Sequence, residues 1–302
     1  MAYRPSHAIG NYAIEIDGQM AGWVKNVGFP EMKLAKVESK VGSLVHTAKA
    51  GGQYEHTGFE ASYSVSEMGK ARDWIMSLVK QDVVTADGAI IQANHNFEGI
   101  RRVDWTVGNI TSFKLPKLAA AEGKNPFMID FKWEAETIEW SKASGKITTE
   151  QGKKHKQWGT NNFTVDGLVG ETQWIQEVEL PEITAKLAKE SYGSQRLQAL
   201  HYANIDSGDV KFKISGRSLD SHLDYIKKVI KDGKLTADEY LAITVTMMDP
   251  SLQKALGDIV LKGCGLTSFA LDKPESNADK MASFTLTFSV EEFELNIKEI
   301  DK

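Results

Sequence analysis

The chain is nearly free of cysteine, and this absence excludes two kinds of stabilising scaffold. Among its 302 residues, Cys264 is the only cysteine. A disulfide framework or a cysteine-based zinc cluster needs several thiols in one chain. The fold must therefore rest on a hydrophobic core, for which the apolar content of 41% is ordinary in a globular protein.

Long apolar runs and an excess of positive charge are also missing. No run of about 18 apolar residues occurs, so the sequence predicts no transmembrane helix. The segment Met1–His7 contains no apolar secretory core, and we expect synthesis in the cytoplasm. The 36 basic and 41 acidic residues give a net charge of −5, whereas a protein that coats nucleic acid is clearly basic.

Catalytic and metal-binding motifs are absent from the sequence. There is no dinucleotide-binding glycine fingerprint, no phosphate-binding Walker loop and no nucleophile elbow. No two histidines have the i, i+4 spacing of a helical zinc pair. The seven histidines are His7, His46, His56, His95, His155, His201 and His222. We therefore expect a protein that is not an enzyme, with no catalytic, cofactor-binding or metal-binding residues and no cofactor.

Three local patterns each allow a functional and a structural interpretation. Asn204–Asp209 resembles a fragment of a calcium loop but lacks its glycine and its distant glutamate, which favours a turn between strands. Cys264 lies between two glycines, without a basic neighbour in sequence, and is expected to be a small apolar filler. Asp17-Gly18 and Asp166-Gly167 each follow a predicted strand and predict type I′ turns.

The second half of the sequence repeats the first. Both halves show an apolar strand, then Asp-Gly, a tryptophan, a valine and Pro-Glu, in the same order. These residues are Ile14–Gly18, Trp23, Val27 and Pro30-Glu31 in the first half, and Phe163–Gly167, Trp174, Val178 and Pro181-Glu182 in the second. The match places two inserted residues between Asp-Gly and Trp. An internal duplication explains this order, and the alternative is two unrelated β domains with similar alternation.

Further segments match in the same order along the two halves. The matching pairs are Gly58–Val65 with Gly208–Ser215, Ile110–Phe113 with Leu266–Phe269, and Phe127–Trp133 with Phe284–Val290. Each pair belongs to a predicted strand, because apolar and polar residues alternate. The predicted strands are Tyr12–Ile16, Phe59–Val65, Asp104–Ile110 and Pro126–Ile138, then Asn162–Val165, Asp209–Ser215, Leu241–Met247 and Ala282–Leu295. The last strand of each half is predicted to be long.

One main helix is predicted in each half. In the first, Ser64 and Glu67 have capping-box spacing before an apolar face. That face comprises Ala71, Trp74, Ile75, Leu78 and Val79. In the second half the predicted stripe comprises Leu219, Leu223, Ile226 and Ile230. The fold class expected is therefore mainly β (α+β), with two tandem β-sandwich or barrel domains that carry one main helix each.

The segment between the halves has the composition of a linker. Residues 141–160 are polar, contain glycine and carry several lysines, without apolar periodicity. We expect domain 1 at 1–140, a basic polar linker at 141–160 and domain 2 at 161–302. The linker is either a solvated tether or a basic strap against an acidic neighbouring subunit.

The repeated pattern resembles the tail tube proteins of contractile-tailed phages and of phage-tail-like injection and type VI secretion systems. In the first half the resemblance rests on Ile16–Gly18, Gly22-Trp23, Val27, Gly51–His56, Arg72–Trp74 and Phe131–Glu136. The second half keeps Val165–Gly167, Trp174 and the terminal strand. It departs at the Gly-His loop, where Ala203–Gly208 stands instead.

The resemblance implies a structural role in a ring with a central channel. Six tube-like domains would close a sheet around the channel, supplied by a homohexamer or by a pseudo-sixfold homotrimer as in baseplate hubs. The implied partners are further copies of the chain, tail tube, hub or spike, and baseplate or sheath proteins. DNA or another cargo would pass through without sequence-specific binding, and no membrane is involved. The implied location is an assembled phage tail or injection particle.

A different class of function remains as the alternative. Trp23, Trp174 and Tyr192 could form a platform of a two-domain β-sandwich module that binds a ligand or glycan. For the two tryptophans, anchoring in a core or contact with a neighbouring chain is the competing interpretation.

Overall fold

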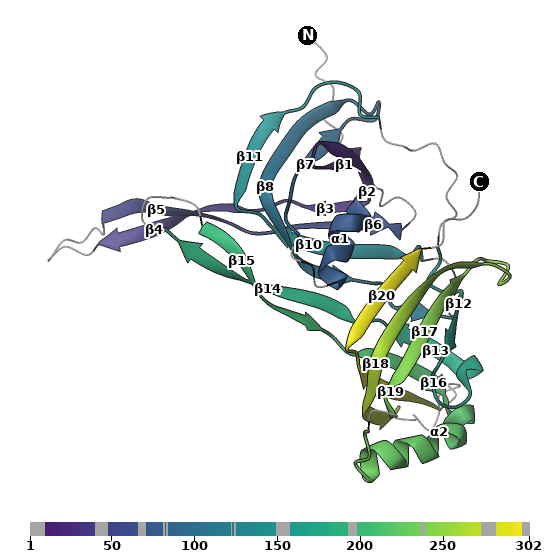
Figure 1. Cartoon of the computed structure of the whole chain (residues 1–302). Helices are drawn as coiled ribbons and strands as arrows, with labels where there is room; N and C mark the ends of the chain where they lie inside the picture. The colour runs from purple at the N-terminus through teal and green to yellow at the C-terminus, as the bar shows by residue number, and fades with distance from the viewer. Residues whose placement is uncertain are drawn as a thin grey trace.

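The chain folds into two β-rich units, each with one α-helix, which confirms the predicted fold class (Figure 1). The computed structural model describes residues 10–39, 48–65, 71–80, 82, 84–121, 123, 125–148, 158–192, 198–236, 239–272 and 282–297. No helix within these ranges is long and apolar enough to cross a membrane.

We call the elements from β1 to β11 unit 1 and those from β12 to β20 unit 2. Unit 1 contains β1 (Asn11–Ile16), β2 (Gln19–Val24), β3 (Asn26–Gly28), β4 (Met32–Ser39), β5 (Ala48–His56), β6 (Phe59–Ser64), α1 (Ala71–Val79), β7 (Ala86–Ala93), β8 (Gly99–Lys114), β9 (Leu118–Ala119), β10 (Met128–Glu134) and β11 (Thr137–Lys142). Unit 2 contains β12 (Phe163–Asp166), the 3₁₀ turn η2 (Thr172–Trp174), β13 (Ile175–Glu179), β14 (Glu182–Ser191), β15 (Gln198–Ser207), β16 (Val210–Ser215), the 3₁₀ turn η3 (Gly216–Ser218), α2 (Leu219–Ile226), the π-helical turn η4 (Lys227–Lys231), β17 (Leu241–Met248), β18 (Ala255–Leu271), β19 (Ser283–Ser289) and β20 (Glu292–Ile297).

The two units have the same strand order. In unit 1 the sheet runs β2-β1-β7-β8-β10-β6-β3, and β11 also pairs with β8. In unit 2 it runs β12-β17-β18-β19-β16-β13, and β20 also pairs with β18. Each strand in the main sheet of unit 2 thus takes the chain order and the sheet position of one strand of unit 1, and the hairpin β14-β15 follows β13 as β4-β5 follows β3. Among the described elements, β2 and β9 have no strand counterpart in unit 2, and η2 occupies the place of β2 in the chain.

Irregularities of the sheets also coincide. The register between β8 and β10 skips Thr111, and the register between β18 and β19 skips Thr267. A second irregularity contains a left-handed residue in each unit, Val107 (φ 52°) in β8 and Gly263 (φ 62°) in β18. Both pairs of residues are separated by 156 positions, 111 to 267 and 107 to 263. Bulges are inherited features of a fold, so this coincidence favours one ancestral unit over two unrelated β domains.

The pairing corrects the sequence alignment in three places. Ala61 pairs with Val27 and Phe212 with Val178, so the match of Gly58–Val65 with Gly208–Ser215 is shifted by one residue. Phe131 pairs with Phe113 and Leu286 with Phe269, so the match of Phe127–Trp133 with Phe284–Val290 is shifted by two residues.

The third correction concerns the first strand of each unit. Ile14 pairs with Ile90 in unit 1, and Val165 pairs with Val245 at the equivalent place in unit 2. Ile14 therefore corresponds to Val165, 151 positions later, as Val27 corresponds to Val178. The two residues placed between Asp-Gly and Trp are not an insertion, since Trp23 and Trp174 are also 151 positions apart.

The Asp-Gly turns differ between the units. Asp17 and Gly18 both have positive φ, 49° and 74°, as the predicted type I′ hairpin turn between β1 and β2 requires. Gly167 has φ 87°, but Asp166 is an ordinary strand residue of β12, so the predicted turn at Asp166-Gly167 is wrong. A Cβ on Gly167 would lie 2.0 Å from the carbonyl oxygen of Ala242, so this glycine permits a close approach of the backbone.

Alternation along the strands builds the core. In β10, Ile129, Phe131 and Trp133 are fully buried, while Asp130 and Lys132 between them are exposed. The Phe131 and Trp133 rings stack with centroids 5.0 Å apart, and other aromatic rings of unit 1 surround them. These are Phe59, Tyr63, Trp74 and Trp105. Unit 2 has the same alternation in β19, with Phe284, Leu286 and Phe288 buried.

The predicted long terminal strands are interrupted. Residues 126–138 form β10 and β11 with a break at Ala135-Glu136, and residues 282–295 form β19 and β20 with a break at Val290-Glu291. The longest strands are instead β8 and β18, with 16 and 17 residues. Both halves of each broken strand run along one long strand, so the side-chain alternation continues while the backbone kinks.

The helices agree with the prediction in unit 1 and differ in unit 2. The predicted face of α1 is buried throughout, whereas Glu67 of the proposed capping box lies outside the described residues. In unit 2 the buried stripe comprises His222, Tyr225, Ile226 and Val229. Ile230 is 45% exposed, so its placement on the predicted stripe is wrong.

Two apolar residues of the predicted linker are buried, although most of residues 141–148 are exposed. Lys142 belongs to β11, and the buried Ile147 donates its backbone N–H to Phe97 O at 2.8 Å. Trp158 is buried, with its ring 5.6 Å from that of Phe127 in unit 1. A Cβ on Gly257 in unit 2 would lie 2.3 Å from the same indole. Residues 149–157 lie outside the described residues.

The shared bulge predicts opposite effects of matched substitutions. A left-handed valine is strained by about 1–3 kcal/mol, so Val107→Gly should have a melting temperature at least equal to wild type and above that of Val107→Ala. Gly263→Val should lower it, because a branched residue is strained at φ 62° and its Cβ would lie 2.7 Å from Glu291 Cβ. Calorimetry tests this ranking. A Val107→Ala variant more stable than Val107→Gly would contradict the left-handed conformation.

Candidate functional site

Unit 2 joins unit 1 through a strand pairing at the end of β8. Lys114, Phe113 and Ser112 of β8 pair antiparallel with Glu182, Ile183 and Thr184 of β14. On its other edge the same stretch of β8 pairs with β10. On the edge of β8 that β14 occupies, β7 pairs with residues 99–108. Strand β14 continues this edge beyond the end of β7 (Figure 1). We call this contact the internal junction.

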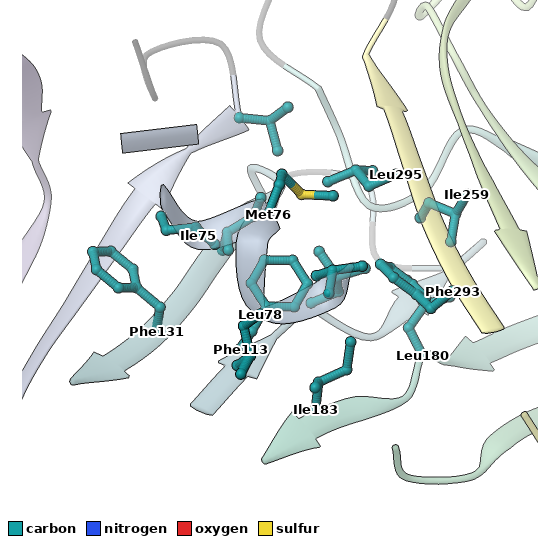
Figure 2. Close-up of a cluster of buried hydrophobic side chains, with 14 of the residues drawn as sticks. Ile75, Met76, Leu78, Phe113, Phe131, Leu180, Ile183, Ile259, Phe293 and Leu295 are labelled. Carbon is teal, nitrogen blue, oxygen red and sulfur yellow. The ribbon is translucent and has the colours of Figure 1, made fainter. Parts of the chain in front are cut away.

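Apolar side chains from both units fill the internal junction. Figure 2 shows Phe113 and Leu78 of unit 1 close to Ile183 and Phe293 of unit 2. The rings of Phe113 and Phe293 meet edge to face, with centroids 6.2 Å apart. The buried cores of the two units form one continuous cluster. Burial of these groups stabilises the junction in the same way as the interior of a domain.

A groove remains beside this apolar contact. Its volume is about 470 Å³, and Met76, Ile183, Phe293 and Leu295 are among its lining residues. Helix α1 contributes one wall and β20 the other, and Figure 2 shows the Met76 side chain directed toward Leu295. The lining also includes polar residues from both units, and the groove belongs to the seam between the two units. The polar residues are Lys80, Ser207, Glu291, Glu292, Glu294 and Asn296.

Strand β15 extends the internal junction over the surface of unit 1. The backbone N–H of Leu200 donates to Glu136 Oε1 at 2.9 Å, and the Tyr202 hydroxyl donates to Ile110 O at 3.1 Å. Burial of the phenol raises the pKa of Tyr202 to about 12. Lys189 of β14 forms an ion pair with Glu134, with Nζ and Oε2 3.0 Å apart. The hairpin therefore lies across the neighbouring unit.

A second, smaller strand pairing also joins the two units. Leu118 and Ala119 of β9 pair with Val178 and Glu177 of β13. The Glu177 carboxylate lies 2.6 Å from Lys117 Nζ, and this hydrogen bond lowers the pKa of the carboxyl. Val178 is fully buried, so an apolar contact supports the polar one. Two separate strand pairings thus fix the orientation of unit 2 relative to unit 1.

The predicted aromatic platform is not assembled. Trp23 is buried, with its ring 5.1 Å from that of Phe97. Trp174 is 36% exposed, lies under the Arg217 guanidinium at 5.5 Å and donates to Glu171 Oε2. Tyr192 is exposed and donates to Glu190. These contacts share no residue, so no observation favours the glycan-binding module.

The remaining single-residue candidates take structural positions. Cys264 is buried, and burial raises the pKa of its thiol to about 11, far from the reactive range. The calcium-like segment Asn204–Asp209 was predicted to be a turn, but its first four residues belong to strand β15 and only Gly208 and Asp209 connect β15 to β16. Among the described residues no group of three or more potential metal ligands occurs. His7, His46 and His155 lie outside them.

The residues that form the internal junction were missed by the sequence analysis. Strands β14 and β15, like β4 and β5, were not predicted. Their signal is visible in Ile183, Ala185 and Leu187, which alternate with polar residues. Pro181-Glu182, at the start of β14, was matched with Pro30-Glu31 by sequence, and this match could have located both hairpins.

Comparison with known proteins gives structural similarity without sequence similarity. No protein-family model matches the chain, and no curated protein sequence matches it. A protein from the tube-terminating cap of the anti-feeding prophage is similar in structure, with 11% identity and a TM-score of 0.41 over 50% of this chain and 99% of that one. A chain of the sheath-tube complex of the PVC extracellular contractile injection system has 13% identity and a TM-score of 0.37 over 45% and 89%. Hcp1 from Flavobacterium johnsoniae has 12% identity and a TM-score of 0.31 over 45% and 100%.

The internal junction predicts a large difference between two matched truncations. Ile183 is 4% exposed, whereas Met32, at the equivalent position of unit 1, is 47% exposed. Loss of the buried side chain creates a cavity, so Ile183→Ala should reduce the free energy of unfolding by about 2–5 kcal/mol. Met32→Ala should change it by less than about 0.5 kcal/mol in the monomer. Denaturant unfolding measures both, and equal effects would contradict the burial of β14.

The phenol of Tyr202 predicts an alkaline weakening of the same junction. Its pKa is raised from 10.0 to about 12, so its contribution to stability is complete below pH 10 and is lost as the pH rises toward 12. Tyr202→Phe should lower stability by about 1 kcal/mol at neutral pH and flatten the decline above pH 10. Melting curves across this range test it, and an unchanged slope would contradict it. Tyr225→Phe should flatten the decline as well, because the pKa of Tyr225 is also raised to about 12, but its hydroxyl donates to the Glu239 carbonyl within unit 2 and lies apart from the junction.

Proposed function

We propose that the chain is a structural subunit of a phage tail or contractile injection particle. In this proposal it forms a sixfold or pseudo-sixfold ring of the inner tube, or of the hub between tube and baseplate. The observation that carries the proposal is the internal junction: two units of the same topology are joined side by side through the edges of their sheets. Repetition of such a contact generates a ring or a filament.

The arrangement of the units suits a ring of three chains. Each chain supplies two neighbouring positions, so a homotrimer provides six, with a channel for DNA or another cargo at the centre. A homohexamer is the second arrangement, with units at two levels of a tube. In both, the faces of the ring contact tube, spike, baseplate or sheath proteins, and the chain contributes shape and closure rather than catalysis. The domain limits 1–140 and 161–302 mark the two ring positions.

Solution mass and electron microscopy test the proposal together. Native mass spectrometry should give a species of about three times the 33.4 kDa chain, and negative-stain images should show six-lobed rings. Six chains per ring, or filaments, would indicate the tube arrangement. A protein that stays monomeric at tens of micromolar, with no ring in any image, would contradict the function.

A further inference from the structure

The internal junction has an unfilled counterpart at each end of the chain. In the described structure, the edge of β18 that corresponds to the β14-binding edge of β8 has no strand partner over residues 267–271. Strand β4, the counterpart of β14, pairs with β5 alone. We propose that β4 of one chain pairs antiparallel with this β18 edge of a second copy. The inference rests on the proposed function and names the contact that builds the ring.

The repeat fixes the register of this contact. Phe113 corresponds to Phe269, since they pair with the equivalent residues Phe131 and Leu286 of β10 and β19. Ile183 corresponds to Met32, because Val178 and Val27 hold equivalent places in β13 and β3. Since Ile183 pairs with Phe113, Met32 of one chain pairs with Phe269 of the next. By the same step Lys33 faces Ser268, and Glu31 faces Ala270.

Exposed apolar side chains lie at the places this contact would cover. Met32 is 47% exposed and its counterpart Ile183 4%. Leu271 is 61% exposed and its counterpart Leu115 2%. Large apolar side chains on a surface indicate an interaction site when they cluster. Here each occupies a position that is buried where the junction is formed, so the second copy is the occupant that fits.

At two further positions an exposed side chain has a counterpart that is buried beside the internal junction. Trp140 of β11 is 45% exposed, and its counterpart in β20 is Leu295, which is buried in the groove of the internal junction. The pairings of both with the equivalent residues Val103 and Ile259 establish this correspondence. Ile230 is 45% exposed in the helical turn η4, and it lies 151 positions after Val79 of α1, which lines the groove. In the assembled contact Trp140 of one chain therefore packs beside Ile230 of its neighbour.

A polar contact is repeated as well. In the internal junction the Ser112 hydroxyl donates to Glu182 Oε1 at 2.9 Å. The counterparts are again a serine and a glutamate, Ser268 and Glu31. In the single chain Ser268 is exposed and Glu31 forms an ion pair with Lys33. The second copy thus gives Ser268 the partner that its counterpart already has.

Cysteine pairs test the register directly. Lys33→Cys with Ser268→Cys places two thiols opposite each other across the proposed contact, within reach of a disulfide. Mild oxidation should give a covalent ladder on non-reducing gels that ends at the number of chains in the ring. Each single variant should stay a monomer on the gel, as the native Cys264 is buried. The matched control, Ser112→Cys with Thr184→Cys, should close a disulfide within one chain.

The outcomes separate this inference from the proposed function. Rings without the Lys33–Ser268 crosslink, in a preparation where the control disulfide closes, overturn the β4–β18 pairing and leave the ring intact. A protein without rings or crosslinks overturns both. A crosslinked ladder with a closed end supports both.

A charge substitution gives a second readout that needs no disulfide. Leu271→Glu should abolish rings by native mass spectrometry and leave the melting temperature of the monomer unchanged. Leu252→Glu is the matched control, because Leu252 is also exposed, at 59%, but lies in the turn before β18. It should assemble as wild type does. Normal assembly of Leu271→Glu overturns the inference.

Discussion

Pairing at the edges of the sheets determines how the two units are joined. A strand edge presents unpaired N–H and C=O groups, and an edge that is flat and apolar pairs with whatever strand is available. The exposed edge of the long strand β8 is paired by β7 along one stretch and by β14 of the other unit along the next. The contact between units is therefore an extension of the sheet, and the core continues beneath it. This explains how two similar units become one body without a large separate interface.

The bulges allow each long strand to pair within its own unit and with a neighbour. A strand of 16 or 17 residues must bend if one part lies in a barrel wall and the other reaches a neighbour. The skipped threonines, Thr111 and Thr267, and the left-handed Val107 and Gly263 provide the bend at the same two places in each unit. Unit 1 keeps a strained valine where unit 2 has glycine, but Val107 gains a hydrogen bond from its backbone N–H to Asp87 at 2.8 Å. The geometry is retained although the residue differs.

The sequence pattern predicted the strands that pack within one unit and missed those that pack against the other unit. Alternation located β1, β6, β16 and β19, because their inner faces fill their own core. Alternation predicted one continuous strand across the breaks at Ala135-Glu136 and Val290-Glu291, because it carries no information about which strand is the partner. It did not locate β14, although Ile183 and Ala185 alternate with polar residues there, and the alternation does not record that the other unit buries Ile183. In α2 a count of aliphatic residues selected Ile230, whereas the core takes His222 and Tyr225, which can also form polar contacts.

Duplication within one chain lets two neighbouring positions diverge while their edges stay equivalent. The inner faces differ: unit 1 packs four tryptophan and phenylalanine rings around Trp133, whereas the core of unit 2 relies more on aliphatic side chains. Trp23 is buried, and its counterpart Trp174 lies on the surface under Arg217. A ring of identical single units presents the same residue at every position. A chain with two non-identical units presents alternating residues, so its assemblies have half the rotational symmetry of their unit count. The bulges are kept in both units, so divergence of the surface residues left the course of the long strands unchanged.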